Sequence, residues 1–263
     1  MKVTRNGAQH SLKELEVSVM LAGNFDASYT ASDNQLVVPT DTMKNTVNIL
    51  AKEKLGTANE EFGITLGEHF LKTYSQVRRA EIEIAEHNWE RMVSRGNPHP
   101  HSFVERGAAR SFTKVVFYAG RSMVDSGIEN LLIAKTTGSG FSGYMKDKFT
   151  TLPETNDRIL ATRLKAVWSY ERAPKSYSSA NGAIVEAMLE VFANEFSPSV
   201  QATLYQMGEA ALKTVRELSQ ITISMPNQHC LPVNLAPFGM ENKNELFVPT
   251  DEPHGLIEGT VSR

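Results

Sequence analysis

The sequence predicts an α+β protein built from antiparallel sheets and paired helices. In several segments apolar residues alternate with polar ones, as in half-buried strands, and in others they recur at helical spacing. These segments come in pairs along the chain, two strands and then two helices. Strands and helices that alternated singly would indicate a parallel sheet, so this order favours antiparallel sheets.

The first half begins with residues 15–21, whose alternation predicts a strand buried mainly on one face. A short strand is expected at 36–38, because Pro39 should end it. A helix should follow, capped by Thr40 or Asp41 and closed by Gly56.

The next elements complete a set of strands and helices that is then repeated. A second helix carries Phe62, Leu66, Phe70 and Tyr74 at spacing four, and strands return around residues 80–84 and 112–118. Similar patterns predict strands at 131–136, 160–170 and 221–225, and helices whose inner faces span 184–192 and 200–211. We interpret this as a duplicated topology. Small and polar residues at 125–127 interrupt the patterns, so we expect two domains, 1–126 and 127–263.

Composition limits the classes of function. The 263 residues are 41% hydrophobic and 22% charged, with a net charge of −3, which gives no reason to expect nucleic-acid or anionic-membrane binding. Cys230 is the single cysteine, which excludes an internal disulfide or a multi-thiolate zinc site and favours a reducing cytoplasm. We expect no membrane span and no signal peptide.

Two motifs are set aside. Residues 138–143 spell G-x-G-x-x-G, but the threonines and Pro153 that follow do not predict the helix that a dinucleotide site requires. His99 and His101 form a close pair that could share a metal in principle, but Asn97 and Pro98 mark a turn and no cysteine is nearby. We therefore predict no metal site.

The stretch from Phe141 to Arg158 is the most informative part of the chain. Phe141 offers a flat apolar face and Arg158 a planar, permanently charged fork of donors, which together suit a flat, anionic, heteroaromatic ligand. A core phenylalanine and a surface arginine are the alternative interpretation.

Three further segments carry polar groups where a strand meets a helix or ends. The helix start at Thr40 and Asp41 could bind an anion, or these two residues could simply cap the helix. Gln201 lies at a second helix start, and its amide both donates and accepts, as the edge of a purine dione requires, or it faces solvent. Asn227 and His229 alternate on one strand and should share a face, and we expect His229 to titrate in a site.

Together these segments resemble the urate oxidase, or uricase, family over nearly the whole chain. The matching motifs are residues 39–46, 135–141, 149–152, 157–158, 199–201 and 226–229. The resemblance implies two tandem tunnelling-fold (T-fold) domains per subunit and a homotetramer with sites between subunits. It also implies oxidation of urate by O₂ and water to 5-hydroxyisourate and hydrogen peroxide, without metal or organic cofactor.

Carried over by position, the resemblance gives each residue a role. Phe141 would stack on urate, Arg158 would clamp the anion, and Gln201 would bind its opposite edge. Val200, Asn227, Asp41 and Leu152 would complete the substrate site, while Thr40, Asn227 and His229 would hold oxygen or water and relay protons.

One departure from the family pattern leaves alternatives open. Uricases carry an N-terminal Gly-x-Gly-Lys segment whose lysine pairs with the threonine matched by Thr40, and residues 1–7 do not match it. Lys2 lies outside that motif and receives no role. The chain is therefore either an active urate oxidase or a purine-binding homologue with weak or no turnover because the lysine is missing. A related T-fold enzyme acting on pterins, often with zinc, is a third hypothesis.

Overall fold

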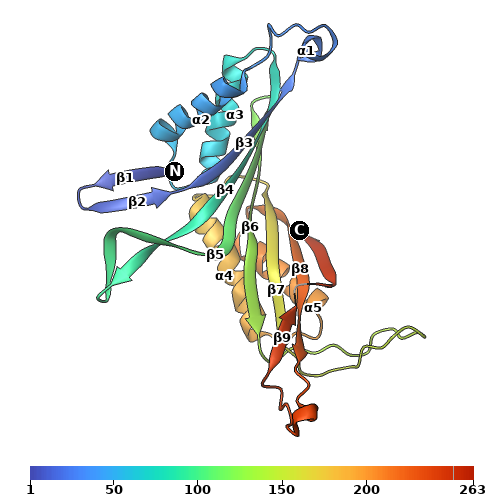
Figure 1. The fold of residues 1–263 in the computed structure, drawn as a ribbon. Helices are drawn as coiled ribbons and strands as arrows, with labels where there is room; N and C mark the ends of the chain where they lie inside the picture. Colours follow the sequence, from blue (N-terminus) through green and yellow to red (C-terminus); the bar gives the residue numbers. More distant parts are fainter. Residues whose placement is uncertain (251) are drawn as a thin grey trace. The chain divides into compact units, whose positions relative to one another are not determined.

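The computed structural model describes residues 1–250 and 252–263 and contains two compact units. The first unit comprises Met1–Ile128, Val167–Asn181 and Glu217–Ser219, and the second comprises Glu129–Ala166, Gly182–Arg216 and Gln220–Arg263. Both combine β-strands with helices (Figure 1), which confirms the predicted α+β class. The division into domains 1–126 and 127–263 stays a prediction.

The first unit holds the elements up to the middle of β6. They are β1 (Lys2–Asn6), β2 (Gln9–Lys13), β3 (Leu15–Gly23), α1 (Asp26–Thr30), α2 (Thr40–Lys54), α3 (Asn59–Thr73), β4 (Val77–Ser94), β5 (Asn97–Tyr118) and the start of β6 (Arg121–Lys135). Strands β3, β4 and β5 are neighbours in one sheet and pair antiparallel, as expected.

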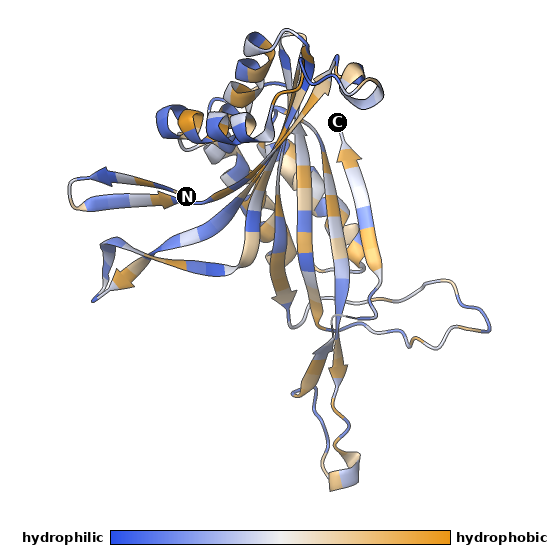
Figure 2. Cartoon of the chain, turned by 45° about the horizontal axis from the view of Figure 1, so that its top comes forward, coloured by the Kyte–Doolittle hydropathy of each residue, from blue (hydrophilic) through white to orange (hydrophobic). Residues whose placement is uncertain are grey.

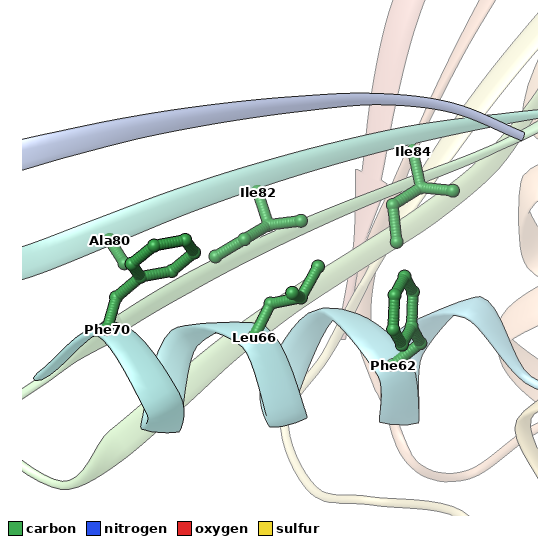
Figure 3. Packing of buried hydrophobic residues seen from close by; sticks show 6 residues of the cluster. All are labelled: Phe62, Leu66, Phe70, Ala80, Ile82 and Ile84. Carbon is green, nitrogen blue, oxygen red and sulfur yellow. The ribbon is translucent and has the colours of Figure 1, made fainter. Parts of the chain in front are cut away.

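The core of this unit lies between α3 and β4. Phe62, Leu66 and Phe70 point from α3 toward Ala80, Ile82 and Ile84 of β4 (Figure 3), and all six are at most 1% exposed. Burying such a side chain contributes roughly 1.5 to 3 kcal/mol. The helical spacing of four and the strand spacing of two thus meet at one interface.

The residues between these apolar ones in β4 face the other way and are charged. Lys114 of β5 forms ion pairs with Glu81 at 2.6 Å and Glu83 at 3.0 Å, and hydrogen bonds to both carboxylates raise the pKa of Lys114. Figure 2 shows the hydrophilic and hydrophobic residues alternating along the strands. This two-sided pattern is typical of an antiparallel sheet with one covered face.

Two expectations near α2 are wrong. Residues 36–38 are turn and irregular backbone instead of a strand, because Val37 N–H donates to the Asn34 carbonyl and folds the segment back. Thr40 and Asp41 are the first residues inside α2, and neither caps it. Pro39 occupies the N-cap position and makes no side-chain hydrogen bond to the helix.

The N-terminal hairpin β1–β2 was not predicted. Gly7 adopts φ +59° in its turn, and the Lys2 ammonium donates to the carbonyls of Ala51 at 2.8 Å and Leu55 at 2.9 Å. A cation is favourable at a helix C-terminus, where carbonyl groups lack partners. Lys2 therefore stabilises the end of α2.

The tight turn between β4 and β5 lies two residues before the predicted one. Arg95 and Gly96 adopt φ +53° and +79°, and Ser94 pairs with Asn97. Positive φ at both central residues matches the right-handed twist of a hairpin. Asn97 and Pro98 consequently belong to β5, and the predicted turn at those residues is wrong.

The second unit holds the rest of β6 and most of the later elements. They are β7 (Leu160–Tyr170), α4 (Tyr177–Asn194), α5 (Val200–Thr214), β8 (Leu218–Pro232), η1 (Ala236–Phe238), β9 (Phe247–Thr250) and β10 (Leu256–Ser262). In this unit β6, β7, β8 and β10 are successive neighbours, and β9 pairs with β8. Residues 125–127 lie inside β6, so the expected interruption of the pattern there is not a break in the strand.

Glycines let the helices approach the sheet closely. A Cβ added at Gly67 of α3 would lie 2.5 Å from the Phe117 Cβ, and one at Gly208 of α5 would lie 2.6 Å from the Val261 Cγ2. Contacts this short do not occur between real atoms. Both helices therefore depend on a residue without a side chain at the contact.

We predict that Gly67→Ala destabilises the protein. Alanine favours a helix by about 1 kcal/mol relative to glycine, whereas overpacking a tight contact costs about 1 to 3 kcal/mol. The cost of the clash exceeds the gain in helix propensity, because the Phe117 Cβ is attached to the backbone and cannot rotate away. Chemical denaturation should show a net loss, and Gly56→Ala, with no atom within 4 Å of its added Cβ, is the control. A Gly67→Ala protein as stable as the parent would contradict this.

We also predict a pH-dependent stabilisation at His87 of β4. Its Nδ1 lies 2.9 Å from Glu105 and its Nε2 3.1 Å from Glu16. Hydrogen bonds to Glu105 and then to Glu16 raise the His87 pKa, and they outweigh burial and the charge of Arg110, which lower it. The hydrogen bond to His87, with the charge of Arg110, lowers the pKa of Glu16.

The sign of each shift sets the pH window. The raised pKa of His87 contributes stability below pH 6.5 that is lost as the pH rises through the folded-state pKa. The lowered pKa of Glu16 contributes stability above pH 4.5 that is lost in acid. His87→Gln should therefore lower the thermal unfolding midpoint most between these values, and His69→Gln should not. Parallel pH profiles for His87→Gln and the parent would count against the network.

Candidate active site

A cavity of about 640 Å³ lies in the second unit, where the segment before β7 meets the end of β8. Five of the predicted site residues line it: Phe141, Leu152, Arg158, Asn227 and His229. Other lining residues include Asp157, Ile159, Cys230, Glu245 and Phe247. The volume falls within the range of small-molecule sites, and the lining is mixed apolar and polar.

The loop between β6 and β7 brings Phe141 and Arg158 to the cavity. In Figure 1 it leaves the end of β6 as a long excursion and returns to β7. Gly138 turns the chain at φ +73°, and the Asp157 carboxylate accepts from the Thr137 hydroxyl at 2.9 Å and the Gly138 N–H at 3.1 Å. As predicted, no helix begins directly after residues 138–143, although a dinucleotide loop of this kind requires one.

Phe141 and Arg158 lie next to each other. Phe141 exchanges two backbone hydrogen bonds with Thr155, at 2.7 and 3.0 Å, and the Arg158 guanidinium carbon lies 5.4 Å from the centre of the Phe141 ring. A cation at this distance interacts favourably with an aromatic face. The two side chains that the sequence singled out therefore form one surface.

Arg158 is half-buried and has an unused donor. Its Nε is buried and has no hydrogen-bond partner, although its backbone N–H donates to the Ser139 carbonyl at 2.8 Å. Burial lowers the pKa of the Arg158 guanidinium below its usual range. Arginine nevertheless stays charged at neutral pH, so the cavity contains a partly desolvated cation with a free donor.

Asn227 and His229 come from the end of β8. The Asn227 N–H donates to the Gly255 carbonyl at 2.9 Å, and His229 pairs with Thr250 of β9. Both are half-buried, as are Gln228 and Cys230 between and after them, and all four line the cavity. Strand alternation alone therefore does not distinguish Asn227 and His229 from their neighbours.

Val200 and Gln201 start α5 and do not line the cavity in the single chain. Val200 is 4% exposed, Gln201 is exposed, and the Ser199 hydroxyl caps the helix by accepting from the Ala202 N–H at 3.1 Å. Backbone bonds nevertheless join this helix start to the cavity loop, since the Ser197 carbonyl accepts from Gly140 N–H at 2.8 Å. Their binding roles stay predictions.

Thr40 and Asp41 belong to the first unit. Both are exposed on the first turn of α2, where Asp41 pairs with Lys44 at 2.9 Å and accepts from Asn45 at 3.0 Å. Thr40 lines a groove of about 370 Å³ between α2 and β3. The roles expected of these two residues also stay predictions.

His99 and His101 lie in the first unit and, among the residues described, are not part of a cluster that could hold a metal ion. The two rings are 4.6 Å apart edge to face, and His10 lies 5.7 Å from His101. Within residues 1–250 and 252–263, no group of three or more His, Cys, Asp or Glu side chains is arranged to hold a metal ion. None of the helices in these ranges is long and apolar enough to cross a membrane.

Two contacts of the loop were not predicted from the sequence: the hydrogen bonds that Asp157 accepts from Thr137 and Gly138, and the stacking of Tyr144 on Phe141. A signal for Asp157 was present, since an aspartate next to the predicted Arg158 can accept backbone N–H groups. Tyr144 and Phe141 are three residues apart in a segment without periodicity. The contact between them depends on the turn at Gly143, which has φ +70°, and no local pattern predicts it.

The fold and cavity together define an α+β protein in which an aromatic ring and a half-buried arginine line one cavity. Comparison with known proteins identifies the family. A model of the uricase family matches residues 1–116 and 124–258. The chain belongs to the uricase family.

The chain matches most of the length of its individual relatives. The chain is 40% identical over 264 residues to the uricase of Arthrobacter globiformis, covering 100% of this chain and 85% of that protein. It is 38% identical over 270 residues to the uricase of Oryctolagus cuniculus, covering 100% of this chain and 90% of that protein.

Solved structures support the fold. The crystal structure of the Arthrobacter globiformis uricase superposes with a TM-score of 0.94 at 39% identity, covering 100% of this chain and 90% of that one. A uricase from Bacillus fastidious gives a TM-score of 0.83 at 25% identity, covering 94% and 81%. The T-fold class expected from the resemblance is thereby confirmed.

Proposed function

We propose that this protein is a urate oxidase that converts urate, O₂ and water to 5-hydroxyisourate and hydrogen peroxide without a metal or organic cofactor. Membership of the uricase family supports urate as the substrate. The observation that carries the proposal is the half-buried Arg158 with its unpartnered Nε, 5.4 Å from the Phe141 ring in a cavity large enough for a purine.

The physical argument starts with how the cavity binds an anion. A flat purine stacks on the Phe141 ring, while the guanidinium of Arg158 donates parallel hydrogen bonds to a deprotonated edge. Charge-assisted hydrogen bonds of this kind contribute about 1.5 to 3 kcal/mol each. A guanidinium that has already lost part of its hydration favours the urate anion over neutral urate.

The remaining predicted residues complete the site in the proposed assembly. Asn227 and His229 face the bound purine, hold oxygen or water over it, and relay protons. Gln201 and the Val200 backbone bind the second polar edge. Thr40 and Asp41 come from a neighbouring subunit, which makes a homotetramer a condition of activity. We also propose a cytoplasmic setting, consistent with a single, half-buried Cys230.

The reaction balances without a further reagent. Urate loses two electrons, O₂ accepts them and becomes peroxide, and the oxygen of water bonds to C5 of the purine. Two protons go to the peroxide. Because ionised urate is electron-rich enough to reduce oxygen directly, the protein has to bind, deprotonate and position it.

The test of this function is turnover by the purified full chain. We expect the urate absorbance to fall with matching O₂ consumption and peroxide release, and we expect full activity after exhaustive chelation. Urate binding without turnover would instead support the purine-binding homologue. Activity that chelation removes and zinc restores would contradict the cofactor-free proposal, and turnover of a pterin but not urate would favour the pterin hypothesis.

Arg158→Ala tests the anion clamp. Loss of the charge-assisted bonds should weaken urate binding roughly 100-fold or more, and Arg158→Lys should recover only part of this, because lysine lacks the planar fork. Calorimetric titration measures the affinity, and the exposed Arg216→Ala in the same unit is the matched control. Unchanged affinity in Arg158→Ala would mean that the clamp is assigned to the wrong residue.

A further inference from the structure

Tyr144 stacks on Phe141 and has no assigned role. The two ring centroids are 4.7 Å apart with an angle of 15° between the planes, so the rings are nearly parallel. Tyr144 is half-buried, and it is not among the residues that line the cavity, whereas Phe141 is. One face of the Phe141 ring is therefore covered by Tyr144, while the Phe141 side chain still contributes to the cavity wall.

The tyrosine hydroxyl is anchored as well as the ring. It donates to the Leu152 carbonyl at 2.5 Å, and Leu152 lines the cavity. The Lys146 ammonium lies 5.5 Å from the Tyr144 ring and pairs with Glu154 at 2.7 Å. Tyr144 is thus hydrogen-bonded to the returning segment of the loop and stacked on Phe141, which limits its freedom to move.

We propose that Tyr144 is a positioning residue that holds the Phe141 ring at the angle required for stacking on the substrate. The inference rests on the proposed function, because it assigns to Tyr144 the support of the urate platform. A side chain on a loop loses rotamer freedom on binding, and a parallel ring stacked on it imposes that loss before the ligand arrives. Tyr144 touches neither substrate nor the reacting atoms in this scheme.

The magnitude follows from the stacking contact. An aromatic pair contributes about 0.5 to 1.5 kcal/mol beyond its buried area, which corresponds to a change of about 2- to 13-fold in affinity. The platform contacts substrate and transition state alike, so its loss should raise KM and leave kcat nearly unchanged. A defect confined to folding would not produce this division between KM and kcat.

Three variants test the proposal. Tyr144→Ala should raise KM, and the Kd of urate measured without oxygen, by about 3- to 10-fold with kcat within about twofold. Tyr144→Phe keeps the ring and should recover most of the affinity. Met145→Ala, next in sequence and 94% exposed, is the control and should match the parent.

Two results would contradict the positioning role of Tyr144. Equal damage in Tyr144→Ala and Tyr144→Phe would show that the ring contributes nothing, and a lower KM in Tyr144→Ala would show that the tyrosine competes with substrate for Phe141. Either result overturns the inference while leaving the proposed function intact. If the parent protein fails to bind urate at all, the proposed function fails first and this inference fails with it.

Discussion

The cavity depends on a backbone junction centred on Ser139. This residue is fully buried, and its carbonyl accepts from the Arg158 N–H at 2.8 Å. Its neighbours Gly138 and Gly140 exchange hydrogen bonds with Ser197 at 2.9 and 2.8 Å. One buried segment therefore fixes the arginine, the loop that carries Phe141 and the start of α5. Because backbone groups make these bonds, the arrangement tolerates variation in the surrounding side chains better than a side-chain network would.

The polar groups in the protein interior divide into satisfied and unsatisfied ones. Glu60 is 2% exposed, and its carboxyl group accepts from Ser126 at 2.5 Å and Asn181 at 2.7 Å, so this buried polar group is hydrogen-bonded. Four buried side-chain atoms lack a partner in the part of the chain described, and the Arg158 Nε is the charged one among them. An unpaired buried donor is costly to the folded protein, and a bound anion would offset that cost. This contrast distinguishes Arg158 from a surface arginine that is merely half-covered.

Much of the architecture was predictable because periodicity reports burial. The spacing of Phe62, Leu66 and Phe70 predicted α3, and the alternation around Ile82 predicted part of β4, which extends from Val77 to Ser94. The strand predicted at 36–38 was wrong, since three apolar residues in a row do not by themselves specify a strand. The start of α2 was predicted correctly but its cap was not, because Thr40 lies inside the helix, whereas the hydroxyls of Ser176 and Ser199 accept from backbone N–H groups at the starts of α4 and α5.

The sequence by itself determined the α+β class, the order of most helices and strands, and the residue types that suit a planar anion, because these follow from local periodicity and side-chain chemistry. Only the tertiary structure decided which of those residues meet. Phe141, Leu152 and Arg158 reach Asn227 and His229 through a loop without periodicity, whereas Gln201 lies outside the cavity of the single chain. The reason is that contacts between distant segments are set by backbone pairing and by positive φ at residues such as Gly138 and Gly143, and local sequence patterns do not encode these contacts.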